Sequence, residues 1–589
     1  MLGIRVSPRR LLAVALFAVL SALAIPEGQA VGITNAADDL RTGWYGDQYS
    51  LTPQLVASAE FARRFDVPIQ GQVYAQPLVY KGSLIVATEA NWIYRMDPEN
   101  GTVFWSKSLG VPWNAGDIGC GDLTPTIGVT GTPVLDDTTE TIYLVSKTYN
   151  SGTSGPAAYW MHALDLFTGR ERANFPVKIQ GAAQNNASAS FNPTKQLQRP
   201  GLLLLDGVVY AGFGGHCDFT VWHGWVAGVS TSGVLKALWV TRSGNQNGAA
   251  IWQSGGGLVS DGPGRLFITT GNGGSPTTPI PGNTPPANLG NVVARLAVQG
   301  NGTLQAVDFF SPYNAGHLDA VDLDLASSAA TGLPSQYFGT AGYPHLLVQA
   351  GKEGFVYLMN RDNLGGCQQG SGGSDNVIQR LGNYGGVWSR PSVWPGDGGW
   401  VYIVHSDNAF RAYQYGVDGT GKPKLTSAGT TAENFGFGTG APVVTSSGTT
   451  GGSALIWVIK LTDTNGLNAQ LRAYDAVPGA GVLNLRFSST IGTATKFTPP
   501  GVGADRIYVG TRDGHLLAYG ATAINLTVTK SATPGSVHLG WSGGNAPFIL
   551  QRSPGAKFPS STTLVDRQPA TSYDDPVLAD ANSYFYLTQ

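Results

Sequence analysis

The strongest constraint on the fold is a phrase of short strands that recurs through most of the chain. Each copy begins with a Pro-led apolar strand and a Gly turn, continues with a Tyr-bearing strand, and ends in a strand that runs into an Asp and a Gly. Copies are found at residues 75–105, 131–171, 350–363, 471–479 and 505–520. A repeat of about 40–60 residues with four short strands is typical of β-propeller blades. The sequence therefore predicts an all-β protein dominated by a propeller.

The number of blades follows from the spacing of the phrase. Full blades are predicted at about 75–108, 131–180, 199–241, 254–311, 340–380, 389–430 and 440–488. An eighth, at about 496–520, carries only three strand signals, and an isolated strand within 60–69 supplies the fourth. A ring closed by one strand from each end of the repeat region leaves no open sheet edge. We therefore predict an eight-bladed propeller over residues 58–521, with seven blades as the alternative.

The composition agrees with this fold and limits the kind of partner. The chain has 81 Gly and 35 Pro residues, as expected for many tight turns, and 42% of its residues are hydrophobic. Its net charge is −2 and no long basic run occurs, so a phosphate backbone finds little electrostatic attraction. We expect no nucleic-acid partner.

The N-terminus has the pattern of a targeting segment. Three arginines precede an apolar stretch at 11–24, and small residues follow at 28–30. This order is typical of a cleaved signal peptide, here residues 1–30, followed by a leader at 31–57. We expect a secreted or periplasmic protein without a transmembrane anchor after cleavage. An uncleaved anchor is the alternative.

Three cysteines limit the disulfide and metal chemistry. They are Cys120, Cys217 and Cys367, an odd and low number that excludes a disulfide framework and leaves open one bridge with one free thiol. No CxxC pair and no CxxCH motif occur, so zinc fingers and attached haem are not expected. The His and Cys residues within 216–223 lie on one segment without metal-ligand spacing and make a poor metal site.

Two further segments depart from the repeat. Residues 522–589 show short alternating strands around Trp541 and predict a small β-sandwich. In strand order this part resembles a fibronectin type III module, a class that usually spaces or docks other domains. The Pro- and Thr-rich loop at 274–289 is either a rim over the axial pocket or a surface insertion.

The blade phrase, with Gly after the Asp turn and Trp105 closing the first blade, resembles the repeat of pyrroloquinoline-quinone (PQQ) propellers. The resemblance covers nearly all of residues 60–520. This family includes quinoprotein alcohol dehydrogenases and also propellers that bind no quinone. The resemblance implies the fold, whereas activity depends on the residues of the site.

The middle of the chain resembles the dehydrogenases more closely. Trp252 precedes a strand that ends in Gly271 and Asn272. In quinoproteins a similar Asn ligates Ca²⁺, and an upstream Trp forms the floor under the quinone, which implies these roles for Asn272 and Trp252. Amide oxygens are hard ligands, and an indole presents a flat apolar face. The alternative is a blade-core Trp beside an ordinary turn.

Residues 317–329 resemble the acidic segment of the same enzymes. Asp319, Asp322 and Asp324 match that segment, which implies Asp322 as the catalytic base and Asp324 and Asp319 as Ca²⁺ ligands. Asp322 and Asp324 are two residues apart and are expected to share one face of an extended strand. Lys352 matches the cation that reaches the quinone oxygens. The alternatives are an inter-blade Asp that caps backbone N–H groups and a solvent-exposed Lys in a turn.

Other positions depart from the dehydrogenase pattern. Where those enzymes carry two adjacent cysteines and an Arg, residues 116–128 contain Cys120 alone, which is then the residue expected beside the quinone. Where they carry a metal-binding Glu, residues 212–225 contain none, so Asp218 or His216 would have to replace it.

Two functions therefore stay open. One is a PQQ- and Ca²⁺-dependent oxidation of an alcohol or sugar. The other is a non-catalytic propeller that binds a protein, peptide or glycan at its axial face. Convergence of Trp252, Asn272, Asp322 and Lys352 on one axial funnel would favour the first.

Overall fold

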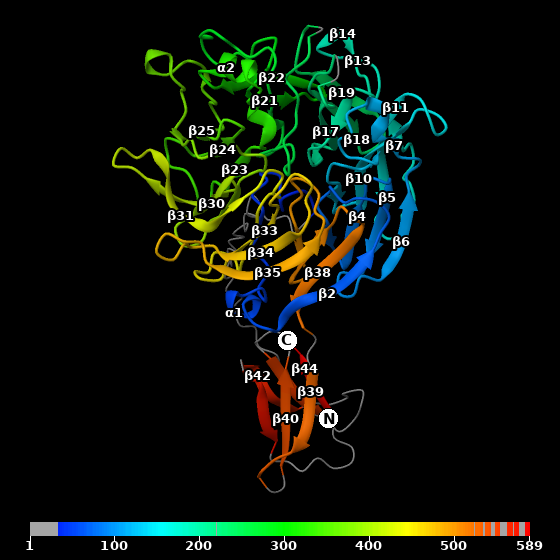
Figure 1. Cartoon of the computed structure of the whole chain (residues 1–589), viewed down its shortest axis with the longest axis vertical. Coiled ribbons are helices and arrows are strands. Elements are labelled where there is room, and N and C mark those ends of the chain that lie inside the picture. Colours follow the sequence, from blue (N-terminus) through cyan, green and yellow to red (C-terminus); the bar gives the residue numbers. More distant parts are fainter. Residues whose placement is uncertain are drawn as a thin grey trace, which may run out of the picture.

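The computed structural model describes residues 33–218, 221–244, 246–522, 525–533, 536–542, 548–553, 562–568, 570–575 and 584–588. Eight sheets form a propeller, and a small β-sandwich follows it (Figure 1). The predicted fold class is confirmed, with eight blades and not seven. The predicted signal peptide lies outside the described residues.

The first four blades are built from short strands that follow one another in sequence, except that the outermost strand of the fourth blade, at Gly366–Cys367, comes later in the chain and pairs parallel with its neighbour. From the inner strand outward they are β3 (Leu78–Tyr80), β4 (Ser83–Ala87), β5 (Trp92–Met96) and β6 (Val103–Ser108); β9 (Val134–Asp136), β10 (Thr141–Tyr149), β11 (Ala157–Asp165) and β12 (Val177–Lys178); β15 (Gln196–Gln198) with β16 (Leu203–Leu205), β17 (Val208–Gly215), β18 (Trp225–Ser230) and β19 (Leu235–Val240); and β20 (Arg265–Thr269), β21 (Val293–Val298), β22 (Leu304–Ser311) and β26 (Gly366–Cys367).

The other four blades follow the same plan. They are β23 (Thr331–Leu333), β24 (Leu346–Ala350), β25 (Val356–Asn360) and β27 (Gln379–Leu381); β28 (Ser392–Trp394), β29 (Trp400–Ile403), β30 (Asn408–Val417) and β31 (Pro423–Phe435); β32 (Val443–Thr445), β33 (Leu455–Lys460), β34 (Ala469–Asp475) and β35 (Leu485–Gly492); and β36 (Gly501–Gly503), β37 (Arg506–Gly510), β38 (His515–Ala521) and β2 (Phe61–Pro68).

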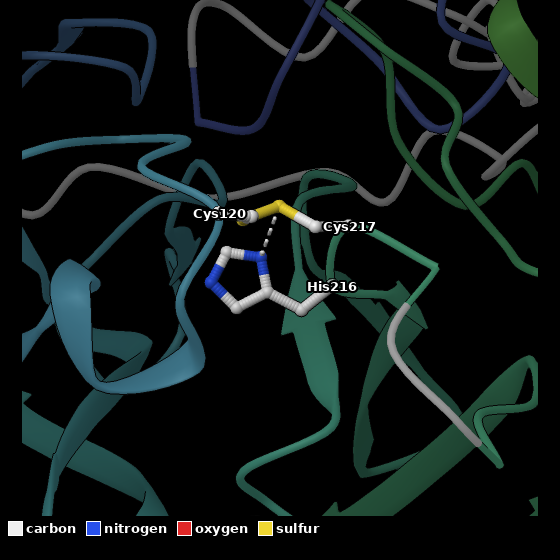
Figure 2. A group of neighbouring side chains, drawn as sticks. All are labelled: Cys120, His216 and Cys217. Carbon is white, nitrogen blue, oxygen red and sulfur yellow. Dashed lines mark hydrogen bonds between the residues drawn. A yellow bond between two sulfur atoms is a disulfide. The ribbon is translucent and has the colours of Figure 1, made fainter.

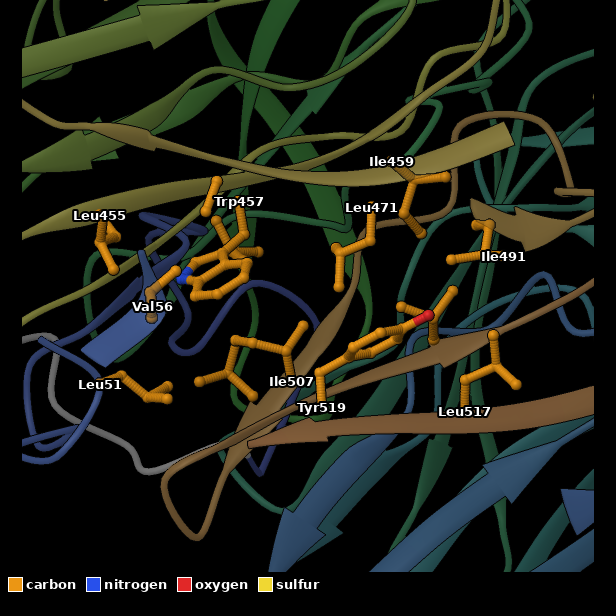
Figure 3. Packing of buried hydrophobic residues seen from close by; sticks show 14 of the residues in the cluster. Leu51, Val56, Leu455, Trp457, Ile459, Leu471, Ile491, Ile507, Leu517 and Tyr519 are labelled. Carbon is orange, nitrogen blue, oxygen red and sulfur yellow. The ribbon is translucent and has the colours of Figure 1, made fainter. Parts of the chain in front are cut away.

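The ring closes as predicted, with a strand from the N-terminal side as the fourth strand of the eighth blade. Strand β2 pairs antiparallel with β38, in a register that places Phe61 opposite Ala521. A buried cluster beneath this junction joins the helix α1 (Pro53–Val56) to the seventh and eighth blades (Figure 3). Trp457 and Tyr519 are fully buried in this cluster. Alternating apolar residues on the strands supply it, because successive side chains of a strand point to opposite faces.

The leader runs along the inner strands of the ring, which the sequence did not predict. Its carbonyl oxygens accept backbone hydrogen bonds from successive blades: from Leu135 to Ile33, from Ser260 to Asp39, from Gly332 to Leu40 and from Val393 to Thr42. Arg41 is fully buried and donates to the carbonyl oxygens of Leu202 and Leu258, at 2.9 and 2.8 Å. Strand β1 (Trp44–Tyr45) then pairs parallel with β32. The leader thereby fills the inner side of most of the ring.

The C-terminal part has two three-stranded sheets. One contains β39 (Asn525–Lys530), β40 (Val537–Ser542) and β43 (Ser572–Asp575), and the other contains β42 (Thr562–Gln568), β41 (Phe548–Ser553) and β44 (Tyr584–Thr588). Trp541, Leu539 and Phe548 are buried in a cluster that joins them. These strands lie outside the ring of blades (Figure 1).

The long loop at 274–289 connects β20 to β21. None of its residues lines the axial cavity described below, whereas Pro285, Pro286 and Leu289 border a groove beside β19. This placement agrees with a surface insertion. Among the described residues, no helix is long and apolar enough to span a membrane.

Candidate functional site

A cavity of about 440 Å³ brings together residues from most of the ring. Its lining consists of Asp122, Arg199, Cys217, Asp218, Trp252, Ser254, Asn272, Asp322, Asp324, Ser327, Lys352, Trp388, Phe437, Lys496 and Phe497. Five of the residues singled out from the sequence are among them: Trp252, Asn272, Asp322, Asp324 and Lys352. The structure therefore places them at one site.

Asn272, Asp322 and Asp324 form a hydrogen-bonded group at one side of the cavity. The backbone N–H of Asn272 donates to Asp324 Oδ1, and its side-chain amide donates to Asp322 Oδ1, both at 2.7 Å. A Cβ at Gly271 would lie 2.2 Å from Asp324 Oδ1, so glycine is required for this approach. The amide oxygen of Asn272 remains available to a ligand, because both bonds use its nitrogens.

Lys352 joins the two carboxylates. It stands in the turn between β24 and β25, and its Nζ lies 2.6 Å from Asp324 Oδ2 and 3.1 Å from Asp322 Oδ2. Burial lowers the pKa of Lys352, but Asp324 and Asp322 outweigh burial and raise that pKa above its usual value. Lys352 is therefore a charged group of the cavity, and not a solvent-exposed turn residue.

The two aspartates differ in their surroundings. The side chain of Asp322 is 69% exposed and that of Asp324 only 7%. Burial raises the pKa of Asp324, and Lys352 opposes this effect. Asp322 is thus open to a substrate in the cavity, whereas Asp324 is fixed by its partners.

The segment that carries these aspartates is not the predicted extended strand. It comprises the helix α2 (Ala315–Ala320), a turn and a short 3-10 helix at Leu325–Ser327. Asp322 has a left-handed backbone (φ 58°). The expectation of an extended strand was therefore wrong, and the turn still directs both side chains to Lys352.

Asp319 is placed apart from the cavity lining. Its carboxylate accepts hydrogen bonds from the backbone N–H groups of Gly273 and Ser275, from the Ser275 hydroxyl and from the Asn291 amide. These bonds hold the turn that follows Asn272. In this arrangement Asp319 supports the site from outside, as an Asp that caps backbone N–H groups does.

Asp218 adds a carboxylate to the cavity from the third blade. Burial raises its pKa, and the charges of Asp322 and Asp324 raise it further, so the three carboxylates repel one another. Their oxygens do not all lie within 4.8 Å of one another in the described structure. We call Asp218, Asn272, Asp322 and Asp324 the acidic pole.

Another part of the cavity lining carries positive charge. Arg199 Nη2 lies 3.8 Å from Asp122 Oδ2, and Lys496 Nζ lies 3.7 Å from Asp122 Oδ1, too far for hydrogen bonds. The Arg199 side chain is 9% exposed, and its guanidinium lies 5.5 Å from the Phe497 ring centre. We call Arg199, Lys496 and Asp122 the cationic wall. Two cations share one carboxylate here, so this wall favours an anionic ligand.

Aromatic rings also line the cavity, namely those of Trp252, Trp388, Phe437 and Phe497. Trp252 packs on Gly214, where a Cβ would lie 2.8 Å from the indole. Trp388 contacts Phe437, and Phe437 contacts Phe497, with ring centres 5.1 and 5.5 Å apart. These faces suit a flat heterocycle.

A disulfide joins Cys120 to Cys217 at the cavity (Figure 2). His216 is fully buried against it, with Nδ1 3.8 Å from Cys217 Sγ. Burial and the charge of Lys147 lower the pKa of His216 to about 3, so the ring is neutral. The two sulfur atoms are bonded to each other, so this Cys–His group offers no thiolate to a metal. Cys367 is free and buried.

A buried acid, Glu89, lies close enough to Arg199 and Asp122 of the cationic wall for their charges to affect its pKa. Its Oε2 accepts hydrogen bonds from the backbone of Gly128 (2.7 Å) and from the Thr130 hydroxyl (3.1 Å), while its Oε1 is buried without a partner among the described residues. Burial raises the pKa of Glu89 from 4.5 to about 7, against the effect of these bonds.

This shift predicts a pH-dependent stability. Below pH 4.5 Glu89 is protonated in both states, and its stabilising contribution is lost as the pH rises from 4.5 through about 7. At about 1.4 kcal/mol per pKa unit, the loss is about 3 kcal/mol. Glu89→Gln keeps an acceptor oxygen and should gain stability relative to the wild type by this amount between pH 4.5 and 8. Denaturant unfolding at both pH values measures it. The partly exposed Glu60→Gln is the control, and an equal difference at the two pH values would contradict the prediction.

The comparisons with known proteins bear on the fold. No family model and no curated protein matches the chain. Among solved structures, a quinohemoprotein alcohol dehydrogenase from Comamonas testosteroni is 14% identical, with a TM-score of 0.56 over 87% of this chain and 84% of that one. One from Pseudomonas putida is also 14% identical, with a TM-score of 0.55 over 84% of this chain and 81% of that one. A europium-containing methanol dehydrogenase is 13% identical, with a TM-score of 0.56 over 83% of this chain and 98% of that one. The chain therefore shares the propeller fold of these proteins, and identities of 13–14% show no more than the fold.

Sequence reasoning found one half of the cavity and missed the other. From the sequence, Asp218 was named only as one of two replacements for the missing Glu, and Arg199, Lys496 and Asp122 were not named. These residues stand in loops of separate blades, without a local motif. The one available signal was the missing Glu, which required a substitute near residue 218.

Proposed function

We propose that this chain is an exported quinoprotein-like propeller that binds PQQ with Ca²⁺ in the axial cavity and oxidises an alcohol or sugar. The observation that carries this proposal is the convergence of Trp252, Asn272, Asp322, Asp324 and Lys352, from separate segments, on one cavity. The propeller shared with quinoprotein dehydrogenases supports it.

The acidic pole fits a calcium ion by its donor chemistry. Carboxylate and amide oxygens are the ligands that Ca²⁺ prefers, and Asn272, Asp324 and Asp218 provide them. Burial and the charges of Asp322 and Asp324 raise the pKa of Asp218, and a bound cation would relieve the repulsion among the carboxylates. Because the oxygens of Asp218, Asp322 and Asp324 do not all lie within 4.8 Å of one another among the described residues, the carboxylates would have to approach one another around a bound ion.

The rest of the cavity fits an anionic planar ring. The face of Trp252 would form its floor, and the cationic wall would attract its carboxylates. Bound PQQ would accept the two electrons of the oxidation. Lys352 would stabilise negative charge on the quinone oxygens, because an ammonium in a partly desolvated site interacts strongly with a developing anion.

Asp322 is the proposed base. Its exposed carboxylate can accept the proton of a substrate hydroxyl, while its bonds to Asn272 and Lys352 orient it. Asp324 is the proposed second metal ligand. Asp319, whose oxygens hold the adjacent turn, is proposed only to support Asn272, and Cys120 is proposed to act through its disulfide.

A non-catalytic propeller is the second candidate. The paired cysteines, the following Arg and the metal-binding Glu of the dehydrogenase pattern are missing from the matching stretches. The axial face would then bind a protein, peptide or glycan. In both cases we propose that residues 1–30 direct export and that 522–589 are a fibronectin type III-like spacer or docking module.

Titration of the purified protein with PQQ, with and without Ca²⁺, tests the proposal. We expect quenching of Trp fluorescence that requires Ca²⁺, and dye-linked oxidation of alcohols or sugars. Trp252→Leu should lose most of the quenching, while Trp160→Phe, on β11 and outside the cavity, should keep it. If the folded propeller shows no quenching and no turnover, the quinoprotein function is excluded. Quenching without turnover would indicate a quinone-binding scaffold.

A further inference from the structure

The disulfide links the two loops that bring carboxylates to the cavity from the first half of the ring. Cys120 stands two residues before Asp122, and Cys217 directly precedes Asp218. The bridge joins positions 97 residues apart in sequence, with a Cα–Cα distance of 6.1 Å. Both aspartates and Cys217 line the cavity. The positions of Asp218 and Asp122 are therefore coupled to the bridge.

Little else holds Asp218 in place. No hydrogen bond and no ion pair of its side chain is found among the described residues; the nearby charges of Asp322 and Asp324 repel it, and only the charge of Lys352 opposes this repulsion. Cys217 and Asp218 both have left-handed backbones, at φ 54° and 52°. Side-chain-bearing residues adopt this conformation at a cost, and it persists when surrounding structure imposes it. Here the bridge supplies that constraint, because Cys217 is one of its two ends.

The bridge is also placed so that a reductant can reach it. Fully buried His216 lies against one side of it (Figure 2), and Cys217 is one of the residues that line the cavity. A dithiol that enters the cavity could exchange with the bridge. One molecule of dithiol would transfer two electrons and two protons, leaving two cysteine thiols and its own disulfide.

We propose, on the basis of the function proposed above for the same cavity, that the Cys120–Cys217 disulfide positions Asp218 for cation binding. Reduction by a dithiol releases the loop and weakens the site. Asp218 then relaxes away from the other carboxylates, which already repel it. The oxidised protein is the form competent to bind Ca²⁺.

Calcium titrations of the full chain test this inference, in a Cys367→Ser background in which no third thiol can exchange with the bridge. Calorimetry with Ca²⁺ should show a Kd at least about tenfold higher after treatment with dithiothreitol, the size of effect seen when groups that position metal ligands are lost. Cys120→Ser combined with Cys217→Ser should bind Ca²⁺ as weakly as the reduced protein. Circular dichroism and thermal unfolding establish that the propeller is folded in each case.

Asp218→Asn distinguishes positioning from a general structural role. If the bridge acts through Asp218, this variant binds Ca²⁺ weakly in the oxidised form, and reduction weakens it no further. A full additional loss on reduction in Asp218→Asn would overturn the positioning role. Equal Ca²⁺ affinity of oxidised and reduced wild type would overturn the inference and leave the proposed function standing. An oxidised protein that binds no Ca²⁺, with or without PQQ, would overturn both.

Discussion

Asp322→Asn is expected to lower the turnover of alcohol or sugar oxidation by about 10²–10⁴-fold, the usual contribution of a positioned general base. The amide has the shape of the carboxylate but cannot accept the substrate proton. Affinity for PQQ and Ca²⁺ should change only a few-fold, because Asn272 and Asp324 remain in place. Steady-state dye-linked assays at saturating PQQ and Ca²⁺ separate these effects. The control is Asp418→Asn, which removes a charge from a turn outside the cavity.

Asp324→Asn should mainly lower the affinity for Ca²⁺, whereas Asp322→Asn should mainly lower turnover. Asp324 is buried and bonded to the Asn272 backbone and to Lys352, so its loss should weaken Ca²⁺ binding first. If Asp322→Asn kept full turnover and Asp324→Asn lost only kcat, the base would be Asp324 instead of Asp322. Inactivity of both without any change in Ca²⁺ affinity would contradict the assignment of Asp324 as a ligand.

Trp457→Ala is expected to destabilise the propeller by about 3–5 kcal/mol, the usual cost of truncating a fully buried large aromatic side chain. Its indole lies in the cluster that joins α1 and β2 to the last two blades (Figure 3). It contacts Phe61 of the closing strand at 5.5 Å between ring centres, and its Nε1 donates to Thr445 Oγ1 at 2.9 Å. The cavity left by alanine therefore weakens the closure of the ring. Chemical denaturation of both proteins measures the change.

Two variants separate this effect from general perturbation. Trp457→Phe keeps most of the apolar volume and should cost less than Trp457→Ala. Leu485→Ala, at a side chain 47% exposed on β35, should change stability by less than about 0.5 kcal/mol. A Trp457→Ala protein as stable as the wild type would show that ring closure does not depend on this cluster.

The blades could be predicted from the sequence because each is a local unit. Strands that pair in a blade are mostly neighbours along the chain, so Gly turns and alternating apolar residues mark them directly. The missing strand of the eighth blade was also visible, because β2 is an isolated strand signal before the first blade. The course of the leader along the inner strands was not predicted. Its contacts come from one blade after another, and no periodicity encodes them.

The candidate site likewise has one part that could be predicted from the sequence and one part that could not. Trp252, Asn272, Asp322, Asp324 and Lys352 lie in the middle of the chain and were named from the sequence, and the cavity contains all five. By itself the sequence determined the propeller and half of its axial cavity, because short-range patterns specify strands and turns. Only the tertiary structure decided that Asp218, the cationic wall and the Cys120–Cys217 bridge complete the cavity. Their meeting depends on how the blades stack around the axis, which brings residues far apart in sequence to one point.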